Sequence, residues 1–203
     1  MLEPALLSRL DLPMGQSPGS LLVLSGPSGV GKTTIAKRLR GVPGITRVMT
    51  TTTRARRAQE VDGRDYRFLD RAAFEAEIAA GAFLEHAEID GNRYGTPKAE
   101  IERKIAEGAL VLVDIDPQGA KSIRSLGLPA FFVFVEPPDM AELRKRLVGR
   151  GSEDPEALRM RLERAEREMT QKTMYDTVVV NRTVEGTTEE ILALLRNRGL
   201  ISG

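Results

Sequence analysis

The chain has 203 residues, a length that suits one domain, with or without insertions, and can bury a substantial core. Its 30 basic and 29 acidic side chains nearly balance, and it contains no cysteine and one histidine, so we expect no nucleic-acid partner, disulfide framework or Cys- or His-ligated metal. No apolar run approaches the roughly 20 residues needed to span a bilayer, and we expect a soluble, cytoplasmic protein without a membrane partner.

The first segment in chain order, residues 1–18, is expected to be a flexible extension. It has an acid at Glu3 and lacks the basic-then-apolar order of a signal peptide. From residue 19 onward, strand-like and helix-like segments alternate, as an α/β protein with a parallel sheet requires.

Four short, continuously apolar segments are typical of strands buried on both faces of a parallel sheet. They cover residues 20–26, 109–116, 130–136 and 176–181. Apolar residues at helical spacing and stop signals predict helices over residues 32–40, 97–108, 139–151, 154–169 and 187–199. Asp139 and Asp154 are expected helix caps, with Pro155 at the first helical position after Asp154.

The segment between the first predicted helix and Pro97 has a different pattern. β-Branched and aromatic residues occur in short runs, interrupted by turns such as VDGRD at residues 61–65 and IDGNR at residues 89–93. We therefore predict a small, mostly β insertion in the parallel-sheet domain.

The loop GPSGVGKT, Gly26 to Thr33, fits the pattern G-x-x-x-x-G-K-[ST] in full and lies between a predicted buried strand and a predicted helix. Its glycines let backbone N–H groups turn toward one anion, and the helix N-terminus adds partial positive charge. Lys32 can reach the β- and γ-phosphates, and the Thr33 hydroxyl can ligate Mg²⁺. The loop predicts a nucleoside triphosphate site but does not separate kinases from hydrolases and switches.

A candidate acceptor site lies in the insertion, where Arg54 and Arg57 are close in sequence and Tyr66 follows. Guanidinium groups are planar bidentate donors and a phenol adds a hydrogen bond, so these side chains, with Tyr94, could clamp a monophosphate. The alternative is a solvated basic turn with Tyr66 packed on it, and composition does not decide between the two.

The chain resembles the guanylate kinases, which transfer the γ-phosphoryl group of ATP to GMP. The resemblance runs from Leu21 to about Leu195 and rests on six motifs in family order and spacing: GPSGVGKTT, TTRARRAQEVDGRDYRF, GAFLEHAEIDGNRYGT, LVDIDPQGAKSI, LRKRLVGRGSE and YDTVVVN. It implies a P-loop nucleoside monophosphate kinase fold, with a parallel sheet core, a mostly β GMP-binding insertion and a helical lid. The implied substrates are ATP and GMP, with dGMP as an open further acceptor.

The motif and the resemblance together imply a role for each site residue. The residues implied in catalysis are Lys32, Arg57, Arg150 and Arg161. Those implied in ATP binding are Gly26, Pro27, Ser28, Gly29, Val30, Gly31, Lys32, Thr33, Thr34, Arg146 and Asn181. Those implied in GMP binding are Thr50, Arg54, Arg57, Glu60, Tyr66, Glu85, Tyr94, Thr96 and Asp114. The implied cofactor is Mg²⁺, held by Thr33 together with the ATP phosphates.

The resemblance also implies a division of the chain. The parts are the extension 1–18, the P-loop core 19–49, the GMP-binding insertion 50–97, core 98–142, the lid 143–162, and core with the C-terminal helix 163–203. Departures from the family pattern are small: Thr50 and Thr96 where Ser is also common, Arg56 where Pro is usual, and Pro117 after VDID.

The resemblance assigns Glu85 to reading the base. Guanine presents adjacent N1–H and N2–H donors that one carboxylate accepts together, whereas adenine has an acceptor at N1 and leaves the carboxylate unpaired. Without the resemblance, a Glu at a strand end is more often a solvated or structural carboxylate. Asp114 and Asp116 end a buried strand, where ligand sites of open α/β sheets gather. Asp114 is favoured for the site, and Asp116 is either a site residue or a helix cap.

Residues 141–168 are rich in Arg but of mixed charge, so they indicate a solvated, salt-bridged helix pair rather than a nucleic-acid helix. That reading covers Arg144, Arg159, Arg164 and Arg167. The resemblance sets apart Arg146, Arg150 and Arg161 as lid residues that close over ATP.

Several alternatives stay open from the sequence. Asn181 is an implied adenine-side contact or a strand-end turn residue, and the lone His86 is expected to serve packing or to hydrogen-bond a site residue from outside the site. A same-fold kinase of a phosphorylated sugar would have no use for Glu85 as a base reader. A non-catalytic phosphopeptide-binding relative would tolerate loss of Lys32, which is present. The oligomeric state is undetermined.

Overall fold

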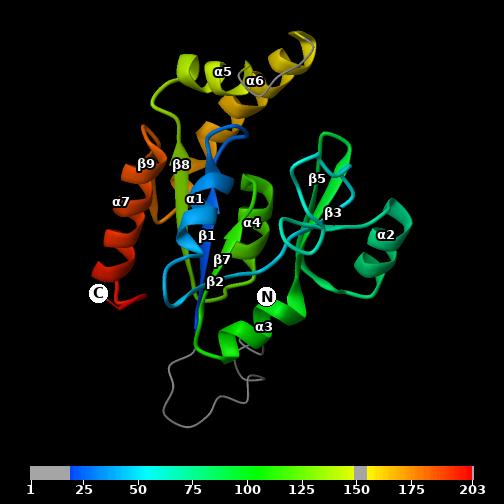
Figure 1. Cartoon of the computed structure of the whole chain (residues 1–203), viewed down its shortest axis with the longest axis vertical. Helices are drawn as coiled ribbons and strands as arrows, with labels where there is room; N and C mark the ends of the chain where they lie inside the picture. The colour runs from blue at the N-terminus through cyan, green and yellow to red at the C-terminus, as the bar shows by residue number, and fades with distance from the viewer. Residues whose placement is uncertain (1–18, 149–154, 203) are drawn as a thin grey trace.

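A five-stranded parallel sheet forms the core of the chain (Figure 1), in the strand order β2-β7-β1-β8-β9. The structure, a computed structural model, describes residues 19–148 and 155–202. The core strands are β1 (Ser20–Ser25), β2 (Ile45–Arg47), β7 (Leu110–Asp114), β8 (Ala130–Glu136) and β9 (Thr177–Val180). The predicted extension 1–18, the predicted cap Asp154 and the predicted lid residue Arg150 lie outside the described residues.

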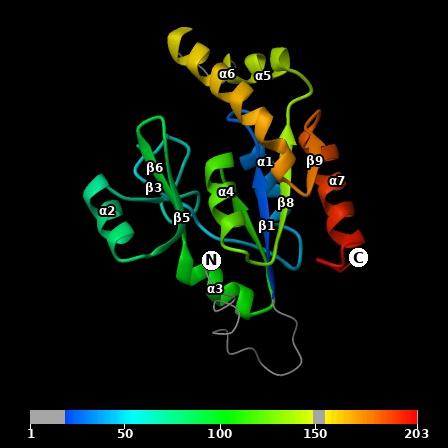
Figure 2. The ribbon, with the colours of Figure 1, turned by 180° about the vertical axis from the view of Figure 1, so that it is seen from behind.

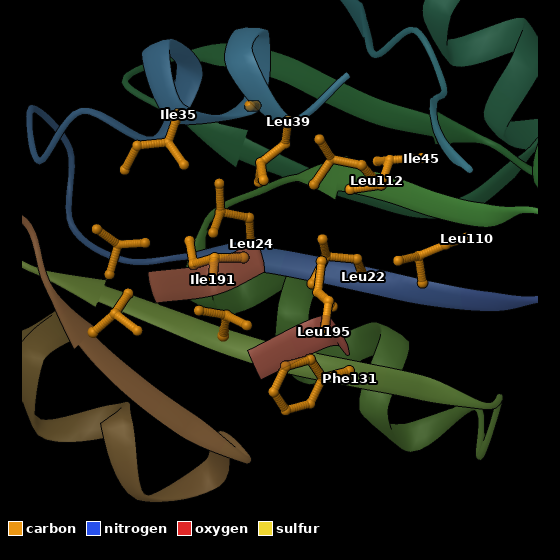
Figure 3. Packing of buried hydrophobic residues seen from close by; sticks show 14 of the residues in the cluster. Leu22, Leu24, Ile35, Leu39, Ile45, Leu110, Leu112, Phe131, Ile191 and Leu195 are labelled. Carbon is orange, nitrogen blue, oxygen red and sulfur yellow. The ribbon is translucent and has the colours of Figure 1, made fainter. Parts of the chain in front are cut away.

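Helices cover both faces of this sheet, which explains why its strands are continuously apolar. They are α1 (Lys32–Leu39) and α7 (Val184–Asn197) on one face, and α3 (Lys98–Ala106) and α4 (Pro117–Ser125) on the other. Leu22 and Leu24 of β1 pack with α1 and α7 (Figure 3), whereas the alternate residues Leu21 and Val23 pack with α3 and α4. The P-loop at the end of β1 is therefore anchored in the most deeply buried strand.

The four predicted core strands are present, and so are the five predicted helices as far as the structure describes them. Helix α4 was not predicted as an element, although Asp116 was considered as a helix cap. The helix predicted from residue 187 begins at Val184, because the Thr183 side chain caps it by accepting a hydrogen bond from the Gly186 N–H. β2 adds a core strand that the sequence pattern did not reveal, since three residues are too short for a periodic signal. The predicted cap Asp139 is confirmed: its carboxylate accepts from the Glu142 N–H at 2.7 Å.

The predicted insertion contains a second, mixed sheet in the order β4-β3-β6-β5. Its strands are β3 (Thr51–Thr52), β4 (Arg67–Phe68), β5 (Phe83–Ile89) and β6 (Asn92–Pro97). It also contains a helix that was not predicted, α2 (Arg71–Ala79), which Asp70 caps and whose Phe74 stacks on Phe83 at 4.6 Å. The alanines in this segment favour a helix, but the surrounding β pattern obscured the signal.

Two further helices, α5 (Met140–Val148) and α6 (Pro155–Met169), stand at the end of the core where β1 leads into the P-loop (Figure 2), and a 3₁₀ turn (Thr170–Met174) follows. Leu143 and Leu147 of α5 pack against Ala165 of α6. In both views the insertion lies beside the core, and α6 lies above the core. Within residues 19–148 and 155–202, no helix combines the length and apolar character that crossing a membrane requires.

Candidate active site

One cavity of about 240 Å³ joins the P-loop, the insertion, the end of β7 and helix α6. The predicted site residues that line it are Gly26, Ser28, Gly29, Gly31, Lys32, Thr33, Thr50, Arg54, Arg57, Tyr66, Glu85, Tyr94, Asp114 and Arg161. The other predicted site residues in the described part of the chain do not line it: Pro27, Val30, Thr34, Glu60, Thr96, Arg146 and Asn181. The predicted donor and acceptor residues thus meet in one place.

The P-loop is shaped by glycines at which a side chain does not fit. Gly26 and Gly31 have φ values of 142° and 105°, in the region that favours glycine. A Cβ at Gly26 would lie 2.1 Å from the carbonyl oxygen of Val135 in the adjacent strand, and one at Gly31 would lie 2.6 Å from Asn181 Nδ2. The loop is therefore pressed directly against the core.

Two predicted ATP-binding residues support the P-loop from behind. The Val30 carbonyl accepts hydrogen bonds from Asn181 Nδ2 at 2.7 Å and from Arg146 Nη1 at 3.2 Å. Asn181 is buried, and its Oδ1 accepts from the Thr187 hydroxyl at 3.1 Å. Because these bonds occupy both ends of the amide, they give Asn181 a loop-supporting position. Direct ATP contact by Asn181 or Arg146 stays a prediction.

Lys32 reaches across the mouth of the P-loop. Its Nζ donates to the carbonyl of Gly26 at 2.6 Å and to that of Pro27 at 3.1 Å. Burial lowers the pKa of Lys32, and the nearby carboxylates of Asp114 and Glu168 oppose that shift. The ammonium group therefore lies within the curve of the loop, where an incoming phosphate can replace the two carbonyls.

Arg54 and Arg57, the predicted phosphate clamp, are held by Glu60. Arg54 Nη2 binds both Glu60 oxygens, at 2.8 and 3.0 Å, and the Arg57 N–H donates to Glu60 Oε2 at 2.9 Å. Arg57 is exposed, whereas Arg54 is half-buried with its guanidinium 5.5 Å from the centre of the Tyr66 ring. The alternative of a solvated basic turn fits the exposed Arg57 but not Arg54, because the Arg54 side chain is half-buried and bound to Glu60. Glu60 lies behind the clamp, and its own contact with GMP stays a prediction.

Tyr66 and Tyr94 form the wall beside the clamp. Their rings meet edge to face with centroids 6.4 Å apart. Burial raises the pKa of Tyr66 to about 12, and the negative charge of Asp114 adds to the shift. The Tyr66 hydroxyl therefore keeps its proton at neutral pH and can donate a hydrogen bond to an anion.

Glu85 lies deep in the cavity and is only 7% exposed, so the solvated alternative for this residue is wrong. The Thr96 hydroxyl donates to Glu85 Oε1 at 2.6 Å. A Cβ at Gly119 would lie 2.6 Å from Oε2, so the carboxylate packs on the first turn of α4. Burial raises the pKa of Glu85 to about 7, the Thr96 hydrogen bond opposes the shift, and the charge of Asp116 adds to it. Glu85 thus presents a poorly solvated carboxylate.

Asp114 and Asp116 both line the cavity at the end of β7. Burial raises the pKa of Asp114, while Lys32 and a hydrogen bond with Thr33 oppose the shift. Asp116 also caps α4, because its Oδ1 accepts from the Gly119 N–H at 2.9 Å. The helix-cap interpretation of Asp116 is therefore confirmed, and a role of Asp116 in the site stays a hypothesis.

Some cavity-lining residues were not predicted as site residues. They are Ala87, Ile89, Asp90, Asn92, Ile115, Arg164 and Glu168. The prediction that Arg164 lies on a solvated helix surface is wrong, because its half-buried guanidinium binds Asp90 of the insertion at 2.5 Å. Helical spacing could have revealed this, since positions 161, 164 and 168 share one face of a helix.

This combination of a parallel-sheet core, a P-loop and a second sheet that carries the predicted phosphate clamp defines the class of P-loop nucleoside monophosphate kinases. Comparisons with known proteins agree, and the sequence profile of the guanylate kinase family matches residues 19–198. The chain is 44% identical over 179 residues to a guanylate kinase of Thermobifida fusca, covering 88% of this chain and 91% of that protein. It is 45% identical over 179 residues to one of Nocardia farcinica, covering 87% and 93%.

A solved structure gives the same result at the level of the fold. The crystal structure of guanylate kinase from Anaplasma phagocytophilum is similar with a TM-score of 0.75 and 35% identity, covering 90% of this chain and 87% of that one. The chain belongs to the guanylate kinase family.

Proposed function

We propose that the chain transfers the γ-phosphoryl group of ATP to GMP, giving ADP and GDP, in the cavity between the P-loop and the insertion. The observation that carries this proposal is that Lys32, Arg54 and Glu85 line one cavity. A triphosphate grip, a monophosphate clamp and a guanine-reading carboxylate then lie within reach of one another. The activity recycles GMP for guanine nucleotide supply, and we place it in the cytoplasm.

On the donor side, the P-loop backbone and Lys32 hold the ATP phosphates. Lys32 exchanges the carbonyls of Gly26 and Pro27 for β- and γ-phosphate oxygens. Because burial lowers the pKa of Lys32, its charge is poorly solvated, and a phosphate partner is correspondingly favourable.

On the acceptor side, Arg54, Arg57, Tyr66 and Tyr94 hold the GMP phosphate, and Glu85 reads the base. The carboxylate accepts N1–H and N2–H of guanine together, whereas the N1 lone pair of adenine would repel it. Thr96 is placed to orient Glu85 through its hydroxyl. Thr50 lines the same cavity and adds a hydroxyl toward the base. We propose dGMP as a further acceptor.

The residues around Thr33 fit a magnesium ion bound with ATP. Mg²⁺ prefers hard oxygen donors and keeps waters and phosphate oxygens as ligands. The Thr33 hydroxyl lines the cavity at the P-loop and supplies such an oxygen, and the described residues contain no cluster of three or more His, Cys, Asp or Glu side chains that would hold a metal alone. When bound there, Mg²⁺ supplies charge neutralisation for the phosphates.

Phosphoryl transfer depends on positioning and charge neutralisation, so a general base is not required. Arg161 of α6 lines the cavity and is placed to neutralise the transferring group together with Lys32 and Arg57. Arg150 is proposed to do the same, and it lies outside the described residues. Closure of α6 and the insertion over both nucleotides would exclude water, which otherwise competes for the phosphoryl group.

A nucleotide panel tests the proposal. ADP release from ATP is followed with GMP, dGMP, AMP, UMP and a ribose bisphosphate as acceptors. We expect release that depends on GMP and is far slower with AMP and UMP. No GMP-dependent release would overturn the proposal, and a preference for the ribose bisphosphate would support a sugar-phosphate kinase instead.

A further inference from the structure

The tip of the β5–β6 hairpin touches helix α6 through one carboxylate. Asp90 Oδ1 lies 2.5 Å from Arg164 Nη1, and Asp90 Oδ2 lies 3.8 Å from Arg161 Nε. All three side chains line the cavity. We propose that Asp90 is a positioning residue that ties the insertion to α6 and so holds Arg161 over the reacting phosphates.

The turn itself does not require a negative charge at this position. Asp90 and Gly91, with φ values of 50° and 73°, form the two-residue turn between the paired residues Ile89 and Asn92. Such turns accept Asn as readily as Asp, because both tolerate the left-handed conformation. Within the turn, the Asp90 backbone carbonyl accepts a hydrogen bond from Asn92 Nδ2 at 2.9 Å. The carboxylate is therefore available to α6.

The two arginines differ in the length of their contact with Asp90. Arg164 lies between Asp90 and the buried Glu168, whose Oε1 is 3.5 Å from Arg164 Nε, so it has an anionic partner on each side. Arg161 is one helical turn away on the same face and has the longer contact with Asp90. Arg164 is thus the structural end of the tie, while Arg161 can exchange Asp90 for a phosphate oxygen. This inference rests on the proposed function, since it assigns Arg161 to the phosphoryl group.

The strength of the tie suits a contact that must form and break. Asp90 is 49% exposed at its side chain, and Arg164 is half-buried. An ion pair of this kind is expected to favour the joined arrangement only about two- to fivefold. That factor is enough to bias α6 toward the insertion without preventing the release of products.

A distance measurement tests the tie without requiring activity. Because the chain has no cysteine, Ala72→Cys on α2 and Met160→Cys on α6, both exposed, give two spin-label sites. We expect Asp90→Asn, which keeps the turn, to lower the ratio of short to long distances about two- to fivefold. The matched control is Glu88→Gln, which removes a carboxylate of the same hairpin that pairs with Arg71 and Arg93 instead of α6.

A double-mutant cycle gives the second test. Arg164→Gln should lower the same ratio, and Asp90→Asn should have no further effect in that background. The tie is overturned if Asp90→Asn changes the ratio no more than Glu88→Gln does, or if the two substitutions are additive. A kcat with ATP and GMP that falls no further in Asp90→Asn than in Glu88→Gln would also overturn it, because Asp90 would then not hold Arg161 over the phosphates. Failure of the kinase assignment is recognised separately, by wild-type protein that releases no ADP with GMP.

Discussion

The donor and acceptor halves of the cavity are held in place by different kinds of contact. The donor half, the P-loop of Gly26 to Thr33, is fixed by close backbone approach to β8 and by hydrogen bonds to the Val30 carbonyl from the buried Asn181 and the half-buried Arg146. The acceptor half, the lining residues of the insertion, is held by ion pairs such as Arg54 with Glu60. At its outer end it meets α6 through the half-exposed Asp90.

This difference predicts which half of the cavity changes its contacts when a ligand binds. Buried hydrogen bonds and close packing are costly to disrupt, so the P-loop should keep its shape whether ATP is bound or absent. Half-exposed ion pairs contribute little each and can be exchanged for phosphate contacts. We therefore expect substitutions in the donor half to affect turnover, and those in the acceptor half to affect the KM and the choice of acceptor.

The largest effect is expected from Lys32→Ala, which breaks the donor half. Losing one positioned cation at the transferring phosphoryl group should lower kcat about 10²–10³-fold. The fold should persist, because the buried strands around the loop are unchanged, and thermal unfolding checks this. Lys121→Ala, at an exposed position of α4, is the control. A kcat within tenfold of wild type would remove Lys32 from its assigned role.

A smaller effect, on choice of acceptor rather than on turnover, is expected from Glu85→Gln. Replacing the carboxylate by an amide removes one of two acceptors for guanine, so the preference for GMP over AMP should fall about 10- to 100-fold. The ratio of kcat/KM for the two acceptors measures this. An unaltered ratio would show that Glu85 does not read the base.

The raised pKa of Glu85 adds a pH dependence to the same prediction. With a pKa of about 7, the carboxyl becomes increasingly protonated as pH falls from 8 to 6, and a protonated carboxyl cannot accept both donors. The KM for GMP should therefore rise as pH falls. The phosphate of GMP titrates near pH 6 as well, so Glu85→Gln, which retains only that contribution, is the reference profile.

In the phosphate clamp, Arg54→Lys should raise the KM for GMP about tenfold while the KM for ATP changes little, because Lys cannot bind a phosphate and Glu60 through one planar fork. Arg56→Lys is the matched control, since the exposed Arg56 donates to the Glu60 carbonyl and does not line the cavity. Equal effects of the two substitutions on KM would mean that the clamp is a basic patch without defined geometry.

The same contrast explains what could be predicted from the sequence. The P-loop is one contiguous segment, and its glycines are required by the conformation of the loop itself. Its position and shape therefore follow from one motif. The core strands are equally readable, because burial on both faces leaves continuous apolar runs. The insertion itself could be predicted from its β pattern, but assigning Arg54, Glu85 and Tyr94 to one acceptor site required the family resemblance, since they are far apart in sequence and no local rule joins them.

The remaining contacts depend on tertiary placement. Nothing in the sequence pairs Asp90 with Arg164, 74 positions apart, or Asn181 with Val30, 151 positions apart. The support of Glu85 by Gly119 was not foreseen for the same reason, because a glycine in a helix has no polar group to mark it. Such positions become visible only when the backbone is in place.

The smallest effect is expected at that glycine and is the most discriminating test of how the acceptor half is built. Gly119→Ala should favour helix α4 slightly, yet its Cβ would displace the Glu85 carboxylate, which lies 2.6 Å away. We expect an unchanged or higher melting temperature together with a severalfold higher KM for GMP. Gly186→Ala, three residues after the cap of α7 as Gly119 is after the cap of α4, supplies the same helix effect far from Glu85. Only the Cβ added at Gly119 would lie beside Glu85. If Gly119→Ala and Gly186→Ala change both the melting temperature and the KM for GMP to the same extent, Glu85 is not positioned by α4.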